Sequence, residues 1–130
     1  MEMEKMALVL NHRQIQQKIT RIAYEVYERN VKEEDLIFAG LTGMGYQLAE
    51  LVVEKLRSIA PFQVQLIKVI LEKSKPKIGE ISLSETPQLK DKSVILVDDV
   101  LNTGKTLAFA MVPFLEAEVK KMEVLVLVNR

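Results

Sequence analysis

Cysteine is absent from this chain of 130 residues, and histidine occurs once, as His12. Without cysteine the chain forms no disulfide and has no thiol chemistry or cysteine-based metal site, which fits a cytoplasmic protein. A single histidine excludes a metal site built from several histidines. We expect His12 to be a solvated residue in the first turn of a helix, because no acid or nucleophile is spaced to meet it.

The sequence also lacks an excess of positive or negative charge, and it lacks long hydrophobic runs. Lysine plus arginine equal aspartate plus glutamate at 18 each, so the net charge gives no argument for nucleic-acid binding. No apolar run approaches the ~18 residues of a membrane span, and the first six residues do not read as a signal peptide. With 48% hydrophobic and 28% charged residues, the sequence is that of one globular domain over residues 1–130.

Helical and strand patterns alternate along the chain. Apolar residues at helical spacing predict helices after Asn11, after the loop that ends at Gly45, and after Thr106, where Pro113 is expected to kink or shorten the helix. Short apolar runs predict buried strands at residues 36–40, 64–71, 94–97 and 123–129. The alternation predicts an α/β fold with a parallel sheet and right-handed crossovers.

The strand at 94–97 is expected to lie beside the strand at 36–40, which gives the strand order 2-1-3-4. The topological switch point then falls between strands one and three, and ligands bind outside the carboxyl ends of strands at such a point. The loop at 41–45 and the loop at 98–106 would face one another across this crevice. Topology alone therefore predicts a ligand site between these two loops.

The polar segment 73–90 is long for a loop of a compact domain. Such a segment is typical of a lid over a binding site, and a merely mobile excursion is the competing interpretation. Residues 81–83, Ile-Ser-Leu, could form one arm of a hairpin within it.

Residues 94–106, VILVDDVLNTGKT, form the most informative stretch of the sequence. A buried strand leads into two adjacent acids, Asp98 and Asp99, and then into a short turn that opens a helix. Backbone N–H groups at a helix N-terminus attract phosphate, and hydroxyl and lysine donors add to them. Two carboxylates beside that site can hold sugar hydroxyls or Mg²⁺. The stretch therefore predicts a site for a phosphorylated sugar.

This stretch resembles the phosphoribosyl-diphosphate (PRPP) motif of type I phosphoribosyltransferases: four hydrophobic residues, two acids, two hydrophobic residues, one variable residue, then Thr-Gly-Lys/Arg-Thr. The agreement over thirteen ordered positions is more specific than a lone glycine motif. Residues 20–30 and the strand and loop that follow are similar to the PyrR group of this family. The resemblance implies a Rossmann-like parallel sheet of the type I phosphoribosyltransferase fold, with the family's C-terminal hood small or missing.

The resemblance also implies roles for individual residues. Asp98 and Asp99 would contact the ribose hydroxyls of PRPP, and Mg²⁺ directly or through ligand or water. The 5′-phosphate would lie in the loop formed by Asn102, Thr103, Gly104, Lys105 and Thr106. The pyrophosphate would lie in the loop formed by Leu41, Thr42, Gly43, Met44 and Gly45, beneath a lid with Lys73 and Lys75. PyrR-like proteins transfer phosphoribosyl groups to uracil, bind messenger RNA in some bacteria, and associate into dimers or larger oligomers.

Three departures from the PyrR pattern bear on function. Thr42 and Met44 stand where the PyrR pyrophosphate loop has cations, and the lid has lysines where PyrR has an arginine. Asn102 stands where purine enzymes of this fold carry an aspartate, which disfavours a purine reaction of that kind. We therefore expect a pyrimidine phosphoribosyltransferase with slow turnover that acts on a base such as uracil.

Two other functions compete with this one. A regulator that senses PRPP or a nucleotide and binds RNA or a protein partner would need little catalysis. A structural subunit with a vestigial site would need none, but the intact motif disfavours it. Thr20 and Arg21 support an RNA surface, whereas Tyr24 and the neutral net charge argue against it.

Overall fold

The computed structural model describes residues 12–41, 43–71, 81–85, 87–100 and 105–128. Its helices are α2 (His12–Arg29), α3 (Met44–Ile59) and α4 (Lys105–Glu116), and its strands are β1 (Asp35–Leu41), β2 (Gln63–Leu71), β3 (Ile81–Leu83), β4 (Ser93–Val100) and β5 (Lys121–Val128). In this part of the chain, no helix is both long and apolar enough to cross a membrane.

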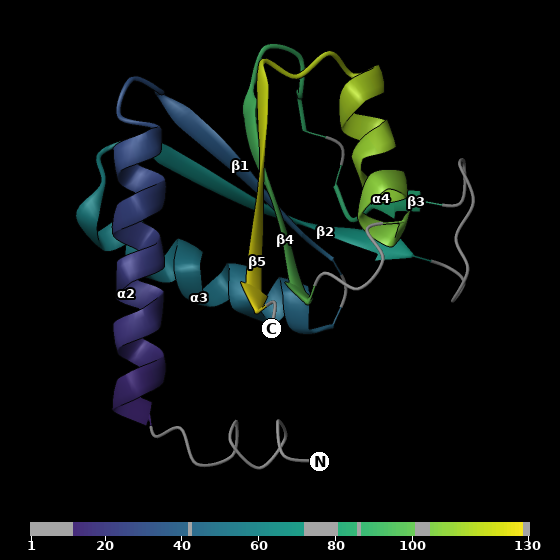
Figure 1. Cartoon of the computed structure of the whole chain (residues 1–130). Helices are drawn as coiled ribbons and strands as arrows, with labels where there is room; N and C mark the ends of the chain where they lie inside the picture. The colour runs from purple at the N-terminus through teal and green to yellow at the C-terminus, as the bar shows by residue number, and fades with distance from the viewer. Residues whose placement is uncertain (1–11, 42, 72–80, 86, 101–104, 129–130) are drawn as a thin grey trace, which may run out of the picture.

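The strands form one sheet in the order β3-β2-β1-β4-β5 (Figure 1). Four of these strands pair in parallel in the order β2-β1-β4-β5. This confirms the predicted order 2-1-3-4, in which the third and fourth predicted strands are β4 and β5. β3 adds an antiparallel strand at the edge of β2, so the hairpin considered for residues 81–83 is present. In the register of the sheet, Gly40 on β1 lies between Lys68 on β2 and Val97 on β4.

Helices cover both faces of the sheet. One core, centred on Phe38, joins α2 and α3 to one face, and the other core, centred on Phe114, joins α4 to the opposite face. Figure 1 shows α4 on the far side of the sheet from α2 and α3. Successive strand residues point to opposite faces, so Phe38 and Ala39 belong to different cores.

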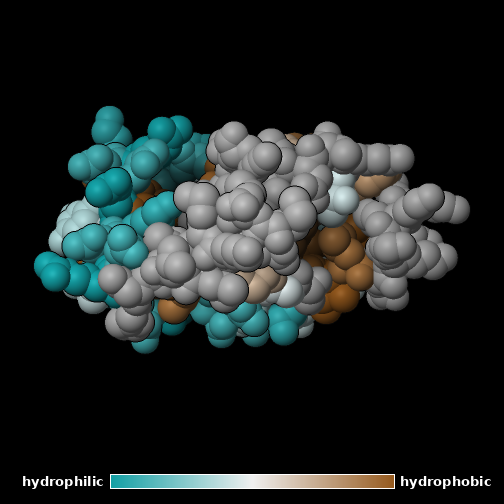
Figure 2. Space-filling model, turned by 60° about the horizontal axis from the view of Figure 1, so that its bottom comes forward, coloured by the Kyte–Doolittle hydropathy of each residue, from teal (hydrophilic) through white to brown (hydrophobic). Residues whose placement is uncertain are grey.

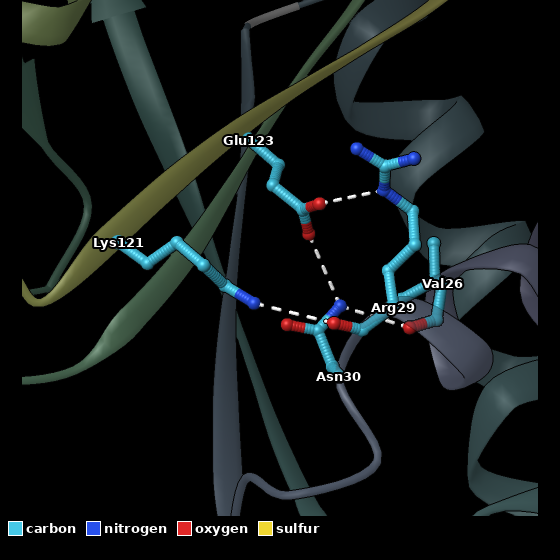
Figure 3. Close-up of polar contacts among 5 residues, drawn as sticks. All are labelled: Val26, Arg29, Asn30, Lys121 and Glu123. Carbon is cyan, nitrogen blue, oxygen red and sulfur yellow. Dashed lines mark hydrogen bonds and ion pairs between the residues drawn. The ribbon is translucent and has the colours of Figure 1, made fainter.

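Polar contacts fasten the end of α2 to β5 (Figure 3). The buried Asn30 donates from Nδ2 to the carbonyl of Val26 at 2.8 Å and to Oε1 of Glu123 at 3.1 Å. Arg29 Nε donates to Oε2 of Glu123 at 2.7 Å, and the ammonium of Lys121 donates to the carbonyl of Arg29 at 3.3 Å. The side chains thus satisfy helix-end carbonyls that have no intrahelical donor.

The structure corrects one of three expectations about these elements. α3 begins at Met44, so Met44 and Gly45 lie in a helix and not in the predicted loop. Within the predicted lid 73–90, Ile81, Leu83 and Leu89 pack in the core beside α4, and residues 72–80 and 86 lie outside the described part, so the lid stays a prediction. α4 passes through Pro113 and ends one turn later, at Glu116.

The small size of the chain predicts association into at least a dimer, because helix faces such as residues 48–59 would be thinly covered within one chain. For α3 this reasoning is wrong. The apolar residues on its inner face are at most 5% exposed: Leu48, Ala49, Val52, Val53 and Leu56. α2 and the sheet cover them within one chain. Association with a second copy stays a prediction, and this helix face does not support it.

Candidate functional site

The carboxyl ends of β1 and β4 lie side by side at one edge of the sheet. From β1 the chain continues through α3 to β2 on one side, and from β4 it continues through α4 to β5 on the other. This divergence is the topological switch point at which ligands bind in open α/β sheets. The predicted crevice therefore coincides with the observed topology.

Two glycines allow the first turn of α3 to sit directly on this edge. An ideal Cβ on Gly45 would lie 2.8 Å from the carbonyl oxygen of Val97 and 3.1 Å from the Cα of Asp98. An ideal Cβ on Gly40 would lie 2.7 Å from the Cα of Tyr46. A side chain at either position would push the helix away. The predicted pyrophosphate loop and the first predicted acid are thus in van der Waals contact.

Gly43 makes the turn between β1 and α3, with a φ of 93° that side chains disfavour. As the residue before the helix, Gly43 has no side chain to bond the first N–H groups of α3. The N–H groups of a first helical turn also lack intrahelical acceptors. They are therefore available to an anion at the edge of the sheet.

The other residues assigned to the pyrophosphate loop have different surroundings. Leu41 is the last residue of β1 and is 3% exposed, so it supports the loop from the core. Met44 is 57% exposed at the start of α3. Thr42 lies outside the described residues.

Asp98 lies within β4, which continues to Val100, so the acids belong to the strand and not to a loop beyond it. The side chain of Asp98 is half-buried, and its backbone pairs with Val126. Asp99 is a residue of the same strand. The strand thus holds both acidic residues on a rigid element, with the backbone of Asp98 beside the first turn of α3.

α4 begins at Lys105, so Lys105 and Thr106 occupy its first turn, directly after the edge that carries the acids. Asn102, Thr103 and Gly104 lie outside the described residues, as do Lys73 and Lys75 of the predicted lid. A second helix N-terminus therefore follows the acidic strand end, as the motif predicts. Two helix N-termini that follow the ends of adjacent strands, with an acidic residue at this edge, suit a ligand that has anionic groups at both ends.

A metal site at this edge would need suitable side-chain ligands among the described residues. They contain no group of three or more histidine, cysteine or acidic side chains able to hold an ion. Mg²⁺ commonly binds through one or two carboxylates together with phosphate oxygens of a substrate. Asp98 beside an anion-binding turn fits a site of this kind, in which the substrate supplies the remaining metal ligands.

Sequence reasoning missed one cation near the site. The ammonium of Lys68, on β2, lies 4.6 Å from the ring centroid of Tyr46, in the first turn of α3. Only the register of β2 against β1 brings these residues together, so no local motif could have indicated them. Lys68 and Tyr46 thus lie beside the predicted pyrophosphate loop.

The side chains whose pKa shifts stand out lie at the opposite, amino end of the strands. The pKa of Glu123 is lowered: burial opposes the shift, and hydrogen bonds from Arg29 and Asn30 outweigh it. Lys92, hydrogen-bonded to Asp35 at 2.8 Å, has a raised pKa. These ion pairs fasten strands and loops together, away from the site.

Comparison with known proteins agrees with this geometry. The sequence matches the phosphoribosyl transferase domain family over residues 7–130. It is 32% identical over 120 residues to a bifunctional protein PyrR of Oceanobacillus iheyensis, covering 84% of this chain and 66% of that protein. It is 33% identical over 132 residues to a bifunctional protein PyrR of Brevibacillus brevis, covering 95% of this chain and 74% of that protein. The chain thus spans about two thirds to three quarters of these relatives.

Solved structures resemble the fold. A hypoxanthine-guanine phosphoribosyltransferase of Bacillus anthracis has a TM-score of 0.74 at 18% identity, covering 94% of this chain and 70% of that one. The hypoxanthine phosphoribosyltransferase of Trypanosoma cruzi has a TM-score of 0.74 at 13% identity, covering 88% and 66%. At these identities the likeness extends to the fold alone.

Proposed function

The chain belongs to the phosphoribosyl transferase domain family, and from this membership we propose that it transfers the phosphoribosyl group of PRPP to a nucleobase with release of pyrophosphate. One observation carries the proposal. Gly45 packs against Val97 and Asp98, so the first turn of α3 and the acidic end of β4 form one continuous edge. That edge matches a ligand with a pyrophosphate on one side of a ribose.

We assign the parts of PRPP to this edge in order. The first turn of α3, after Leu41, Thr42 and Gly43, receives the pyrophosphate. Asp98 and Asp99 accept hydrogen bonds from the ribose hydroxyls. The 5′-phosphate lies at the N-terminus of α4, on Asn102 to Thr106. A Mg²⁺ held by the pyrophosphate oxygens and these acids would help neutralise the charge of the leaving group.

In the proposed step, a ring nitrogen of the base attacks C1 of the ribose as the bond from C1 to the pyrophosphate oxygen breaks. The pyrophosphate leaves with the bonding electrons, and the base loses its proton. No protein nucleophile is needed, so catalysis consists of positioning and of electrostatic stabilisation of an oxocarbenium-like transition state. Strand-borne acids and two helix N-termini supply both.

We propose a pyrimidine, with uracil as the first candidate, as the acceptor base. The similarity to proteins named PyrR supports this choice at 29 to 34% identity. Asn102 points the same way, because an amide cannot serve as the base that purine enzymes of this fold place at that position. The hypoxanthine-guanine structures carry no weight on this question, because they share only the fold.

Calorimetric titration with PRPP and Mg²⁺, followed by a turnover assay with uracil, tests the proposal. The double variant Asp98→Asn and Asp99→Asn is expected to bind PRPP at least ~2 kcal/mol more weakly, on the scale of charged hydrogen bonds. Asp91→Asn is the matched control, because this exposed turn residue has a φ of 62°, which asparagine tolerates. Unchanged PRPP affinity in the double variant would remove the basis of the assignment.

RNA binding is a second candidate function. The outer side of α2 has a hollow of about 550 Å³ lined by hydrogen-bond donors without a carboxylate: Arg13, Gln16, Gln17, Thr20 and Arg21. Figure 2 shows hydrophilic residues gathered at the left of the view, the side on which α2 lies in Figure 1. If RNA binds here, Arg13→Gln with Arg21→Gln weakens binding of an RNA hairpin in fluorescence anisotropy and flattens its salt dependence. An unchanged salt slope would exclude this surface.

A further inference from the structure

The pyrophosphate loop of this chain has a deficit of charge. Thr42 and Met44 are uncharged, and pyrophosphate leaves with several negative charges. Backbone N–H groups at a helix N-terminus supply only about half an elementary charge. A reaction that builds negative charge at this point calls for a cation from another element.

Lys68 lies where such a cation is needed. It pairs with Gly40 in the register of β1 and β2, and paired residues of parallel strands point to the same face of the sheet. Gly40 faces α3, since its ideal Cβ would meet Tyr46 and Ala49. Lys68 therefore rises beside the first turn of α3, and its ammonium lies 4.6 Å from the ring centroid of Tyr46.

The backbone of Lys68 is held on its other side as well. Its N–H donates to Oγ of Ser84 at 2.9 Å, and its carbonyl accepts from the N–H of Ser84 at 2.9 Å. Ser84 directly follows β3, so the short hairpin and β1 together fix Lys68 in the sheet. The flexible part is the side chain beyond Cα.

The charge of Lys68 stays available to a ligand. Among the described residues, the ammonium has the Tyr46 ring as its partner and no carboxylate within ion-pair distance. A cation–π contact at a partly exposed site is weak. A phosphate group, which forms stronger charge-assisted hydrogen bonds, can replace the ring.

The pattern of β2 makes a lysine at this position unusual. Val64 and Leu66 share its face and pack in the core with α3. The next residue on this face is Lys68, at the rim of that core. Burial alone favours an apolar residue there, and a lysine directs its charge past the core to the carboxyl edge.

From this geometry we infer that Lys68 contacts the leaving pyrophosphate, with Tyr46 holding its ammonium in place while the site is empty. The inference rests on the proposed function, since it concerns the same ligand. Lys68 forms and breaks no bond. Its charge offsets the charge that develops on the pyrophosphate as the bond to C1 breaks.

Calorimetric titration of the full chain with two probes tests the inference: magnesium pyrophosphate and ribose 5-phosphate. Lys68→Met is expected to bind pyrophosphate about ten-fold more weakly, because it loses one charge-assisted contact. Binding of ribose 5-phosphate, which lacks this part, is expected to stay unchanged. Lys68→Arg keeps the charge and restores most of the pyrophosphate affinity. Tyr46→Leu removes the contact that the phosphate must replace, so it is expected to strengthen pyrophosphate binding by a few-fold at most.

Lys55→Met is the matched control. This substitution also removes one lysine charge and replaces it by the same side chain. Lys55 lies on α3 nine residues after Tyr46, or about 14 Å along the helix. Equal pyrophosphate affinity in wild type and Lys68→Met would overturn the inference and leave the proposed function standing. Equal losses for both probes would also overturn it, since they indicate a structural role. If the wild type binds neither PRPP nor ribose 5-phosphate, the proposed function fails, and this inference fails with it.

Discussion

Replacing Gly45 by alanine tests whether the site depends on close packing between α3 and β4. The added Cβ would lie 2.8 Å from the carbonyl oxygen of Val97, and ordinary contacts begin at 3.4 Å. The neighbouring atoms belong to the backbone of a central strand, which cannot yield as a side-chain end would. The first turn of α3 must therefore move by about 0.6 Å, on the geometry of such contacts.

The expected loss of stability follows from two opposing effects. Overpacking a tight contact costs about 1–3 kcal/mol. Alanine gains up to about 1 kcal/mol over glycine inside a helix, and Gly45 is the second residue of α3. We therefore expect the free energy of unfolding to fall by about 1–2 kcal/mol, which urea denaturation measures.

The loss of function is expected to exceed the loss of stability. Moving the first turn of α3 separates its N–H groups from Asp98, and a small misplacement in such a site lowers affinity strongly. We expect PRPP to bind at least about ten-fold more weakly in calorimetry at a temperature at which the variant is folded. Gln47→Ala, an exposed position of the same helix, is the control. If Gly45→Ala keeps both wild-type stability and PRPP affinity, the packing argument is refuted.

A double-mutant cycle extends this test to Gly40, whose added Cβ would meet the Cα of Tyr46 at 2.7 Å. Both substitutions lift the same helical turn, so their effects are coupled. We expect the double variant to lose less stability than the two single losses combined. Strict additivity would show that the two contacts are independent.

Two further predictions concern the ion pairs and the charge of the loop. Glu123 has a lowered pKa, so it stabilises the fold above its ordinary pKa of 4.5 and loses this contribution as the pH falls through the lower folded value. The stability difference between wild type and Glu123→Gln in urea should therefore shrink below pH 4.5, and a constant difference would contradict the assignment. Thr42→Lys with Met44→Arg should raise uracil turnover about ten-fold by adding charge to the pyrophosphate loop, and unchanged turnover would show that charge there is not limiting.

The sequence predicted the elements that depend on local patterns. Buried strands such as residues 36–40 consist of continuous apolar runs, and α2 repeats apolar residues at helical spacing. The parallel order then followed, because alternating strands and helices leave few topologies. The motif around Asp98 placed the site at the carboxyl edge, since all its positions are contiguous in the chain.

The sequence failed where distant backbone decides the conformation. Gly43 and Gly45 on either side of Met44 suggest a loop, because glycine disfavours helices. In the structure, Gly45 is helical and its lack of a side chain serves contact with Val97. The contact between Arg29 and Glu123 joins residues 94 positions apart, so no local signal predicts it.

The packing of Leu83 and Leu89 could not be predicted for a related reason. Residues 73–90 are mostly polar, and their few apolar residues show no period that predicts a core position. Leu83 and Leu89 are held because β3 pairs with β2 and lies beside α4, a consequence of the assembled sheet. Protection of the β3 amides against hydrogen exchange is therefore expected to be independent of PRPP.

The two anionic ends of the proposed ligand differ in how the chain encodes their binding. The proposed 5′-phosphate loop consists of consecutive residues, so the effect of a substitution there on phosphate binding can be judged from the sequence alone. In the proposed site, the pyrophosphate end is assembled from the end of β1, the first turn of α3, and Lys68 on β2, which pairs with Gly40. Counting cations in residues 41–45 therefore underestimates the charge at that end. If Lys68 does not reach the pyrophosphate, the neutral loop of this chain predicts weak catalysis. If Lys68 does reach it, the neutral loop gives no reason to expect weak catalysis. The Lys68→Met titration distinguishes these two cases.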